Sequence, residues 1–397
     1  MRTRDFLRAG HWPTLLGAFL YFDVSFMVWM LLGALANSIA VDFALTDSQK
    51  GLLVAIPLLG GALLRIPLGV LADHIGGRRA GAIGLALTIV PLVLVWLWVE
   101  SFSGLLLAGA LLGVAGGSFA VALPLASRWY PLEHQGLAMG IAGAGNSGTV
   151  LAALFGPRLA EPLGWKGVFG LAAGLIVVTL CAFKLLARDA PGHPPPRRLA
   201  HHLGVLRERD TWWLAFFYAV TFGGFVGLAS FLGIFFHDQY GLSKVRAGTF
   251  TAACVFAGSF LRPVGGFLAD RYGGTRLLAV LYAVVAAGVA LIAASPPLFT
   301  AAVTLTMVMG VLGMGNGAVF QLVPQRFSRE IGAVTGIVGA AGGLGGFLLP
   351  IALGGFRGLT GSFAGGLIVL SLVALSSSAA IIQRSRVWES MAPNPSP

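Results

Sequence analysis

Two arginines interrupt apolar stretches of the sequence, and both stand in the same local context. Arg65 lies in "LLRIPLGVLADHIGGRR" and Arg262 lies in "FLRPVGGFLADRYGGTR", each eight residues before an aspartate and 197 positions apart. A guanidinium presents planar, paired N–H donors, which suit a flat oxyanion better than the point charge of an ammonium does. The pair therefore predicts a site for a small planar anion, with one arm from each of two related segments.

The composition is that of a membrane protein. Of the 397 residues, 57% are hydrophobic and 10% are charged, and the mean hydropathy is +0.86. Soluble domains carry about 25% charged residues. Apolar runs of about 20 residues recur between short polar turns, which excludes one large soluble core and indicates helices in a lipid bilayer. The net charge of +11 forms no basic stripe with interleaved aromatic residues, so no nucleic-acid partner is expected.

The apolar runs predict an all-α integral membrane protein with twelve transmembrane helices in two pseudo-symmetric six-helix halves. The expected spans are 15–38, 49–72, 80–99, 104–127, 135–157, 165–186, 211–236, 247–270, 276–294, 298–322, 331–354 and 362–382. The polar, proline-rich segment 188–210 is the expected cytoplasmic linker between an N-terminal bundle, 1–187, and a C-terminal bundle with a short tail, 211–397. The repeated offset of 197 predicts parallel halves with a binding site between them near the midplane.

Lysine and arginine residues indicate how the chain is oriented. An even number of spans puts both termini on one side, and 18 of the 26 lysines and arginines then lie on that side, against six on the other. The positive-inside rule places that side in the cytoplasm, so a multi-pass protein of the cell membrane with two cytoplasmic termini is expected. The first apolar run contains Asp23 and is too long for a secretory signal, which predicts an uncleaved first helix.

Helix geometry places the two arginines deep in the membrane. Eight residues rise about 12 Å, so Arg65 and Arg262 lie near the middle of a hydrocarbon layer about 30 Å thick. An arginine at that depth costs at least about 2.5 kcal/mol and normally faces a cavity or a partner. Asp23 is one possible counter-ion. Alternatively, the arginines snorkel toward the interface or bond carbonyls freed by Pro67 and Pro263, which leaves their symmetric placement unexplained.

The two aspartate segments, "GVLADHIGGRR" and "GGFLADRYGGTR", resemble the loop signature of the major facilitator superfamily. An aspartate at a helix end can pair with an arginine or a helix N-terminus and hold one gate conformation. Ordinary solvation of helix ends is the alternative. The signature says nothing about cargo. The gating candidates are Asp73, Arg78, Arg79, Asp270 and Arg276.

A longer stretch, "GGSFAVALPLASRWYPLEHQGLAMGIAGAGNSGT" at 116–149, resembles the nitrate/nitrite porter family within that superfamily. "FYAVTFGGFVG" at 217–227 and "GIVGAAGGLGGFLLP" at 336–350 are similar to the same family. The resemblance implies nitrate and nitrite as substrates, with flat aromatic faces around a flat anion. It implies a substrate site formed by Arg65, Arg262, Asn146, Tyr218, Phe222 and Phe119. Some relatives carry a serine where this chain has Gly339, so one hydroxyl contact is missing here or is taken by backbone.

The glycines of these stretches also suit close helix packing and sliding. Moving one negative charge into a cell costs about 2.3 kcal/mol per 100 mV, so uptake must be coupled. Nitrate/nitrite exchange is electroneutral, and an empty site with two facing arginines should resist closing. The seven histidines all lie in termini, loops or helix ends, which favours exchange over proton symport. Asp23 leaves proton-coupled uptake open, although it could instead pair with Arg128. A facilitator for another small anion, such as formate or bicarbonate, is a further alternative.

Other protein classes have less support in the sequence. An enzyme would need a nucleophile or metal constellation, and the linker histidines, at 193, 201 and 202, are too irregular for a metal site. Cys181 and Cys254 lie inside spans, so no disulfide, metal or cofactor is expected. A sensor would usually need a soluble signalling domain, which the tail "RSRVWESMAPNPSP" is too short to hold. A functional monomer is expected.

Overall fold

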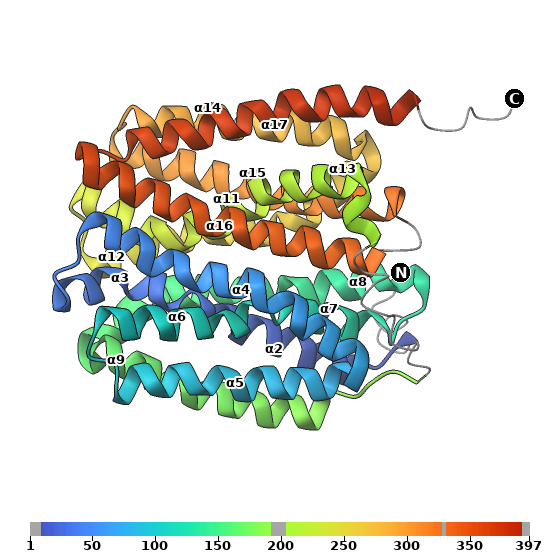
Figure 1. Ribbon diagram of the computed structural model, residues 1–397, viewed down its shortest axis with the longest axis horizontal. Coiled ribbons are helices and arrows are strands. Elements are labelled where there is room, and N and C mark those ends of the chain that lie inside the picture. Colours follow the sequence, from blue (N-terminus) through green and yellow to red (C-terminus); the bar gives the residue numbers. More distant parts are fainter. Residues whose placement is uncertain (1–8, 192–203, 328–330, 391–397) are drawn as a thin grey trace, which may run out of the picture.

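The computed structural model describes residues 9–191, 204–327 and 331–390, and its long helices lie side by side in one bundle (Figure 1). The first half contains α2 (Trp12–Trp29), α3 (Leu31–Asp42), α4 (Asp47–Ile75), α5 (Gly77–Leu97), α6 (Phe102–Gly116), α7 (Phe119–Ser127), α8 (Leu132–Gly143), η1 (Ala144–Ser147) and α9 (Gly148–Leu186). The second half contains η2 (Val205–Arg207), α11 (Arg209–Tyr240), α12 (Lys244–Phe260), α13 (Arg262–Tyr272), α14 (Gly274–Ala293), α15 (Leu298–Arg326), α16 (Ile331–Thr360) and α17 (Ala364–Ser390). The end of the bundle where α9 ends and α11 begins is called the linker end here, and the opposite one the far end.

Eleven helices among the described residues are long and apolar enough to cross a membrane, one fewer than the twelve expected spans. The difference arises in the fifth of them, which covers 49 residues, Ala138–Leu186. It contains most of the expected span 135–157 and the whole of 165–186. Gly164, between them, has non-helical backbone angles (φ 68°, ψ 158°), so this segment consists of two helices.

Packing against α2 shows that the chain reverses direction at Gly164. Gly148, at the start of α9, packs on the backbone of Asp23, and Leu186, at its end, packs on Gly17. Asp23 and Gly17 are only about 9 Å apart along their helix, whereas a straight α9 would be about 58 Å long. The segment therefore accounts for two of the twelve expected crossings.

The aspartate segments end in the same turn in both halves. Gly76 separates α4 from α5, Gly273 separates α13 from α14, and both glycines have φ 90°. A Cβ atom is strained at this φ, so the turn requires glycine. The two turns are related by the same 197-residue offset as the two arginines.

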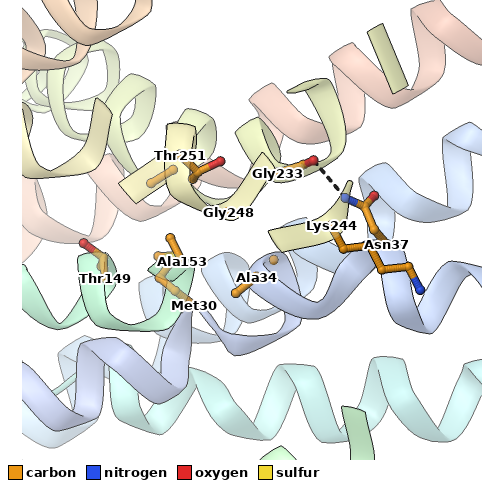
Figure 2. Close-up of a pocket in the computed structure, with 11 residues that line it drawn as sticks. Met30, Ala34, Asn37, Thr149, Ala153, Gly233, Lys244, Gly248 and Thr251 are labelled. Carbon is orange, nitrogen blue, oxygen red and sulfur yellow. Dashed lines mark hydrogen bonds between the residues drawn. The ribbon is translucent and has the colours of Figure 1, made fainter. Parts of the chain in front are cut away.

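Glycines bring the two halves into close contact toward the far end. A Cβ atom on Gly33, Gly51 or Gly248 would lie 2.5 Å from a carbonyl oxygen of the opposite half. These contacts join α3 to α11, α4 to α16, and α12 to α9. Asn37 adds a hydrogen bond across the same interface, donating to the carbonyl of Gly233 at 2.8 Å (Figure 2). Small residues therefore let the helix backbones of the two halves meet directly.

Four charged residues also join the halves at the far end: Asp47, Lys50, Asp238 and Arg357, called the far-end charge cluster below. Lys50 Nζ lies 2.8 Å from Asp238 Oδ2 and 3.3 Å from Asp47 Oδ1. Arg357 Nε lies 3.5 Å from Asp47 Oδ2, and its Nη2 donates to the Asp238 carbonyl at 3.4 Å. The Asp238 side chain is 9% exposed. The cluster carries no net charge and closes the interface between α4, α11 and α16.

The linker end is held differently. Asp73 pairs with Arg128 at 3.0 Å, and Asp210 pairs with Arg384, so each of these ion pairs lies within one half. A Cβ atom on Gly336 of α16 would meet no atom of a described residue within 4 Å, in contrast to the tightly packed glycines toward the far end. The halves are thus bonded to each other at the far end and are more loosely apposed toward the linker end.

The far-end charge cluster predicts that replacement of Asp238 by Asn will favour opening of the far end. The change leaves Lys50 without its ion-pair partner in the opposite half. Removing one member of a partly buried ion pair leaves the other charge uncompensated, so the closed contact between the halves becomes less stable. A cysteine at Ala34, which lines the crevice of Figure 2, would report the opening in a background lacking Cys181 and Cys254. We expect its labelling by an impermeant thiol reagent to become about five-fold faster.

Glu161→Gln serves as the matched control, because Glu161 is an exposed acid near the far-end turn at Gly164. Its labelling rate should match that of the parent. An unchanged rate in Asp238→Asn would show that the cluster does not hold the halves together.

Candidate functional site

Arg65 lies within α4 and is 1% exposed. Its Nη2 donates to the carbonyl of Gly116, at the end of α6, at 3.1 Å. Its Nη1 donates at 2.5 Å to the carbonyl of Gly339 on α16, so this hydrogen bond crosses between the halves. The Nε atom is buried and has no hydrogen-bond partner among the described residues. Pro67 frees the carbonyl of Leu63, so the carbonyls that Arg65 bonds are not the ones released by the neighbouring proline.

Arg262 is positioned by a break in its membrane span. The helix α12 ends at Phe260, and Arg262 begins α13 with Pro263 in its first turn. Gly317 of α15 packs directly against this backbone, since a Cβ atom there would lie 2.3 Å from the Arg262 carbonyl oxygen. The Arg262 side chain is half-buried, and its Nη1 has no partner among the described residues. Broken helices in membrane proteins occur where backbone lines a site.

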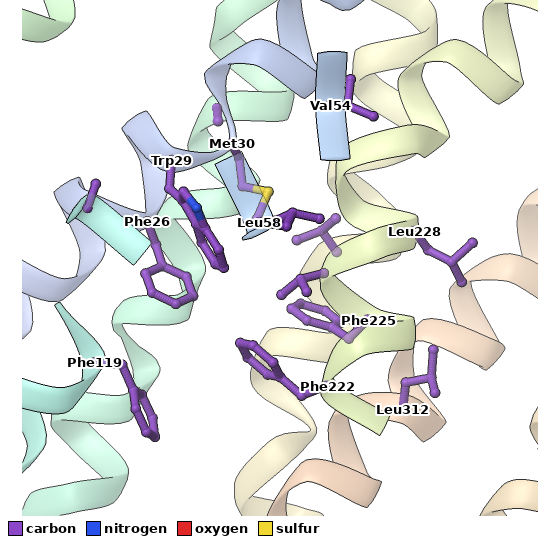
Figure 3. Close-up of a cluster of buried hydrophobic side chains, with 14 of the residues drawn as sticks. Phe26, Trp29, Met30, Val54, Leu58, Phe119, Phe222, Phe225, Leu228 and Leu312 are labelled. Atoms are coloured by element: carbon purple, nitrogen blue, oxygen red, sulfur yellow. The ribbon is translucent and has the colours of Figure 1, made fainter. Parts of the chain in front are cut away.

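Both guanidiniums contact the ring of Phe119. Its centroid is 5.3 Å from the Cζ atom of Arg65 and 5.6 Å from that of Arg262. A second ring approaches each arginine, Phe222 at 5.5 Å from Arg65 and Phe320 at 5.6 Å from Arg262. Figure 3 shows Phe119 and Phe222 approaching from opposite halves. The structure thus brings both arginines to a common ring, at distances suited to cation–π contacts.

Tyr218 completes the aromatic lining. It is 0% exposed and stacks on Phe222, with centroids 5.0 Å apart and an interplanar angle of 6°. It also meets Phe320 edge-on at 4.8 Å. Tyr218, Phe222 and Phe119 are all buried, which excludes a lipid-facing position for them. Phe320 was not predicted from the sequence, because the two phenylalanines in the apolar span 298–322 give no sign of the directions in which they point.

Asn146 lies in η1, a short 3-10 turn between α8 and α9. It is 1% exposed, and its backbone carbonyl accepts hydrogen bonds from Thr149 at 2.7 Å and from Ser259 of the other half at 3.4 Å. Its Oδ1 is buried without a partner in the described part of the chain. Departures from α-helical geometry within a span often mark functional positions. Hydrogen bonds to its backbone carbonyl therefore hold Asn146 in place, while its side-chain amide is available to bind another group.

Asp23 is buried in α2 next to the same turn. Ser147 of η1 donates to its Oδ1 at 2.7 Å. The suggested pairing of Asp23 with Arg128 is not observed, because Arg128 pairs with Asp73 instead. Asp23 makes no ion pair with any described residue. The carboxyl group is thus linked through Ser147 to the turn that carries Asn146.

The gating candidates lie at the linker end. Asp73 pairs with Arg128, and Arg78 donates from Nη2 to the Lys184 carbonyl at 2.8 Å. The backbone N–H of Arg78 donates to Asp189 at 3.0 Å. The remaining candidates, Arg79, Asp270 and Arg276, are exposed. The segments that carry them are therefore fastened to their neighbours in the first half more firmly than in the second.

These contacts define a buried, positively charged site with aromatic walls. Neither Arg65 nor Arg262 forms an ion pair with any residue that the structure describes, so an anion is the group that would compensate them. Across residues 9–191, 204–327 and 331–390, no group of three or more His, Cys, Asp or Glu residues is placed to hold a metal. The histidines at 193, 201 and 202, considered above for a metal site, lie outside the described residues.

The fold is that of a membrane carrier, and comparison with known families agrees. The model of the Major Facilitator Superfamily matches residues 17–350, and the chain belongs to that superfamily. It is therefore a multi-pass membrane transporter and not an enzyme.

Several relatives are similar over nearly their full length. The chain is 34% identical over 362 residues to the "Nitrite extrusion protein" of Bacillus subtilis (strain 168), with 90% of each chain covered. It is 37% identical over 370 residues to the "Probable nitrate/nitrite transporter NarK2" of Mycobacterium tuberculosis (strain ATCC 25618 / H37Rv), covering 89% of this chain and 91% of the relative. It is 34% identical over 365 residues to the "Probable nitrate/nitrite antiporter NarK1" of Thermus thermophilus, covering 83% and 82%.

A solved structure supports the fold. The bacterial homologue of the human lysosomal transporter Spinster, in an inward-facing and occupied conformation, aligns with a TM-score of 0.77 at 20% identity. The alignment covers 96% of this chain and 98% of that one. The expected all-α facilitator fold with two six-helix halves is thereby confirmed.

The position of Phe320 predicts that Phe320→Leu weakens the affinity for the transported anion. Arg262 keeps the ring of Phe119 but loses its second aromatic face, so its guanidinium is less well oriented. We expect the anion concentration for half-maximal uptake into proteoliposomes to rise about five-fold. Phe256→Leu is the matched control, because Phe256 is 53% exposed on α12 and should leave that concentration unchanged. Equal behaviour of the two variants would remove Phe320 from the site.

Proposed function

We propose that this chain transports nitrate and nitrite across the cytoplasmic membrane, binding the anion between Arg65 and Arg262. One observation carries the proposal: two guanidiniums from opposite halves share the ring of Phe119, and neither has an acidic partner among the described residues. The names of the relatives support nitrate and nitrite as the cargo. Alternating access is then rocking of one half against the other around this site.

The surrounding side chains suit a flat anion. Two guanidiniums offer paired N–H donors in a plane, and the stacked rings of Tyr218 and Phe222 form a wall on the same side as Arg65. Phe119 forms a second wall. A slot between flat rings admits a planar anion and disfavours a tetrahedral one such as sulfate. We assign the side-chain amide of Asn146 to the same ligand.

Exchange is the transport mode that the hydrogen bond between Arg65 and Gly339 favours. Arg65 directs one N–H at a carbonyl of its own half and one at a carbonyl of the other half. An anion bound by the same edge of the guanidinium replaces the Gly339 carbonyl, so anion binding releases a bond between the halves. If the halves can move only after this hydrogen bond is released, the empty carrier cannot return across the membrane. Each transported anion must then be followed by another anion in the opposite direction, which is exchange.

The linker end is assigned to the cytoplasm, together with both termini, on the basis of the lysine and arginine distribution. The two bundles, 1–187 and 211–397, then act as the moving bodies. Their cytoplasmic gate is assigned to the aspartate segments, with Asp73 and its partner Arg128 as the ion pair that the structure contains. The remaining proposed gate residues are Arg78, Arg79, Asp270 and Arg276.

Proton-coupled uptake is the second candidate, and Asp23 favours it. Its carboxyl group is buried in a membrane span, accepts a hydrogen bond from Ser147, and makes no ion pair with a described residue. A charged carboxylate is costly in such a place, whereas a neutral one is not. A proton on Asp23 would therefore act on the turn that carries Asn146.

Arg65→Lys and Arg262→Lys should each reduce nitrate uptake at least about a hundred-fold. An ammonium keeps the charge but cannot make the paired, planar contacts. Uptake is measured in proteoliposomes that contain nitrite, nitrate or no anion, with and without a pH gradient. The wild type should take up nitrate when either anion is trapped inside, and the pH gradient should have little effect. Full activity in both lysine variants would rule out the two-arginine site.

The same assay separates the candidate functions. Uptake that ignores trapped nitrite and follows the pH gradient would replace exchange by proton symport, and Asp23→Asn should then abolish the pH effect. Uptake of formate or bicarbonate in preference to nitrate would instead identify another planar anion as the cargo. Lys244→Met is a control for nonspecific charge loss, because Lys244 lies at the far end and outside the site.

Gly339→Ala should loosen the requirement for exchange. A Cβ atom at this position would lie 3.2 Å from Arg65 Nη1 and 3.3 Å from its Cδ, so the arginine must move and its bond to the carbonyl lengthens. Nitrate uptake into anion-free vesicles, with potassium and valinomycin to balance charge, should rise about five-fold relative to exchange.

Gly336→Ala provides the matched control on the same helix, because a Cβ atom there meets nothing within 4 Å. It should preserve the wild-type ratio of net uptake to exchange. If Gly339→Ala also preserves that ratio, the hydrogen bond between the halves does not enforce exchange.

A further inference from the structure

The helix α15 presents a buried amide that the proposed function has not used. Asn316 is 1% exposed, its Oδ1 has no hydrogen-bond partner among the described residues, and its Nδ2 donates to none of them. Leaving a buried polar group unpaired is costly, so such groups in proteins normally serve another group or a ligand. At the repeat offset of 197, Asn316 occupies the position in the second half that Phe119 occupies in the first.

Contacts of the neighbouring residues show where Asn316 points. Leu312 packs on Gly224 of α11, and Gly317 packs on the Arg262 backbone of α13. In a helix, the direction of Asn316 falls between those of Leu312 and Gly317. Phe320 lies one turn farther on the same side, about 6 Å along the axis. Since Phe320 contacts Arg262, the amide lies on the face of α15 that lines the site.

Thr221 brings a second unpaired group to the same region. A Cβ atom on Gly315, the residue before Asn316, would lie 2.6 Å from the Thr221 methyl carbon. The Thr221 hydroxyl is buried without a partner in the described part of the chain. The carbonyl one turn before it, that of Phe217, already accepts a hydrogen bond from Tyr282 at 2.8 Å.

The chemistry of the two anions distinguishes what these groups can bind. Nitrate has three coplanar oxygens, and nitrite has two oxygens with a nitrogen lone pair in the place of the third. A guanidinium binds two oxygens of such an anion side by side. An amide N–H and a hydroxyl on the side away from those two oxygens would therefore meet an oxygen on nitrate, but only the nitrogen lone pair, a poorer acceptor, on nitrite.

We propose that Asn316 and Thr221 bind the third oxygen of nitrate and set the preference of the site for nitrate over nitrite. This inference rests on the proposed function, because it concerns the same substrate site. In this proposal the anion is contacted by polar groups of α15 and α11 in addition to the arginines of α4 and α13. A site built to hydrogen-bond one substrate discriminates against an analogue that lacks the bonding group, since its own polar groups are then left unpaired.

The test compares nitrate and nitrite in proteoliposomes that contain nitrate, for Asn316→Leu and Thr221→Val. For each variant, the external concentration that gives half-maximal exchange is measured separately for the two anions. We expect the nitrate value to rise about ten-fold and the nitrite value to change less than about two-fold. Thr221→Val is nearly isosteric, so it decides the question if Asn316→Leu does not fold. Asn316→Ser, which supplies a hydroxyl donor in place of the amide N–H, should recover part of the nitrate affinity.

Thr304→Val is the matched control. Thr304 is a 7%-exposed threonine on the same helix, three turns from Asn316, and should affect neither anion. Equal losses for nitrate and nitrite in the site variants, or no loss for either, would overturn the inference while leaving the transporter intact. Failure of the wild type to exchange either anion would instead contradict the proposed function, so the two failures are distinguishable.

Discussion

Removal of two guanidiniums from water is the constraint on which the rest of the site depends. Arg65 is 1% exposed in a membrane span, and its N–H groups are met by carbonyls and aromatic faces and by no carboxylate that the structure describes. Carbonyls and rings stabilise a cation, by up to about 2 kcal/mol per desolvated ring contact, without cancelling its charge. The site therefore remains electropositive, and a bound anion is stabilised by the charge of the guanidiniums. An internal ion pair would have neutralised that charge. An acidic residue within reach of both arginines would neutralise their charge, and the site could then no longer attract an anion.

Irregular backbone supplies the polar groups that this site needs. Besides a break at Met30 between α2 and α3, the membrane spans are interrupted at Gly117 between α6 and α7, at η1 between α8 and α9, and at Leu261 between α12 and α13. These interruptions place the carbonyl of Gly116, the amide of Asn146 and the side chain of Arg262 in the middle of the bundle. Broken backbone is tolerated at this depth only where protein or a polar site surrounds it. The breaks at Gly117, η1 and Leu261, which come from both halves, therefore converge on one region, while the outer helices, such as α5 and α14, remain continuous.

The repeat explains why the sequence predicted the two arginines and the two glycine turns. Candidate residues that do not follow the repeat were not predicted in this way. An offset of 197 relates Arg65 to Arg262 and Gly76 to Gly273, and a residue repeated in both halves must perform a task common to both. Family resemblance, not spacing, identified Asn146 and Tyr218. Phe320 was missed because aromatic residues in apolar spans do not reveal the face on which they lie. The carbonyl of Gly339 was foreseen only as a possible backbone substitute for a serine, because backbone contacts between halves depend on helix packing and not on residue type.

The far-end charge cluster shows why charge counting alone was insufficient. Lys50 and Arg357 entered the sequence analysis only as topology signals, because their partners across the interface are far away in the chain. In the structure, α4 carries Lys50 and Arg65, and α16 carries Gly339 and Arg357, so one pair of helices holds both the far-end cluster and the hydrogen bond at the midplane. Two stiff helices that separate at one level must shift at the other. A movement of α4 relative to α16 would therefore change the midplane hydrogen bond and the far-end charge cluster together.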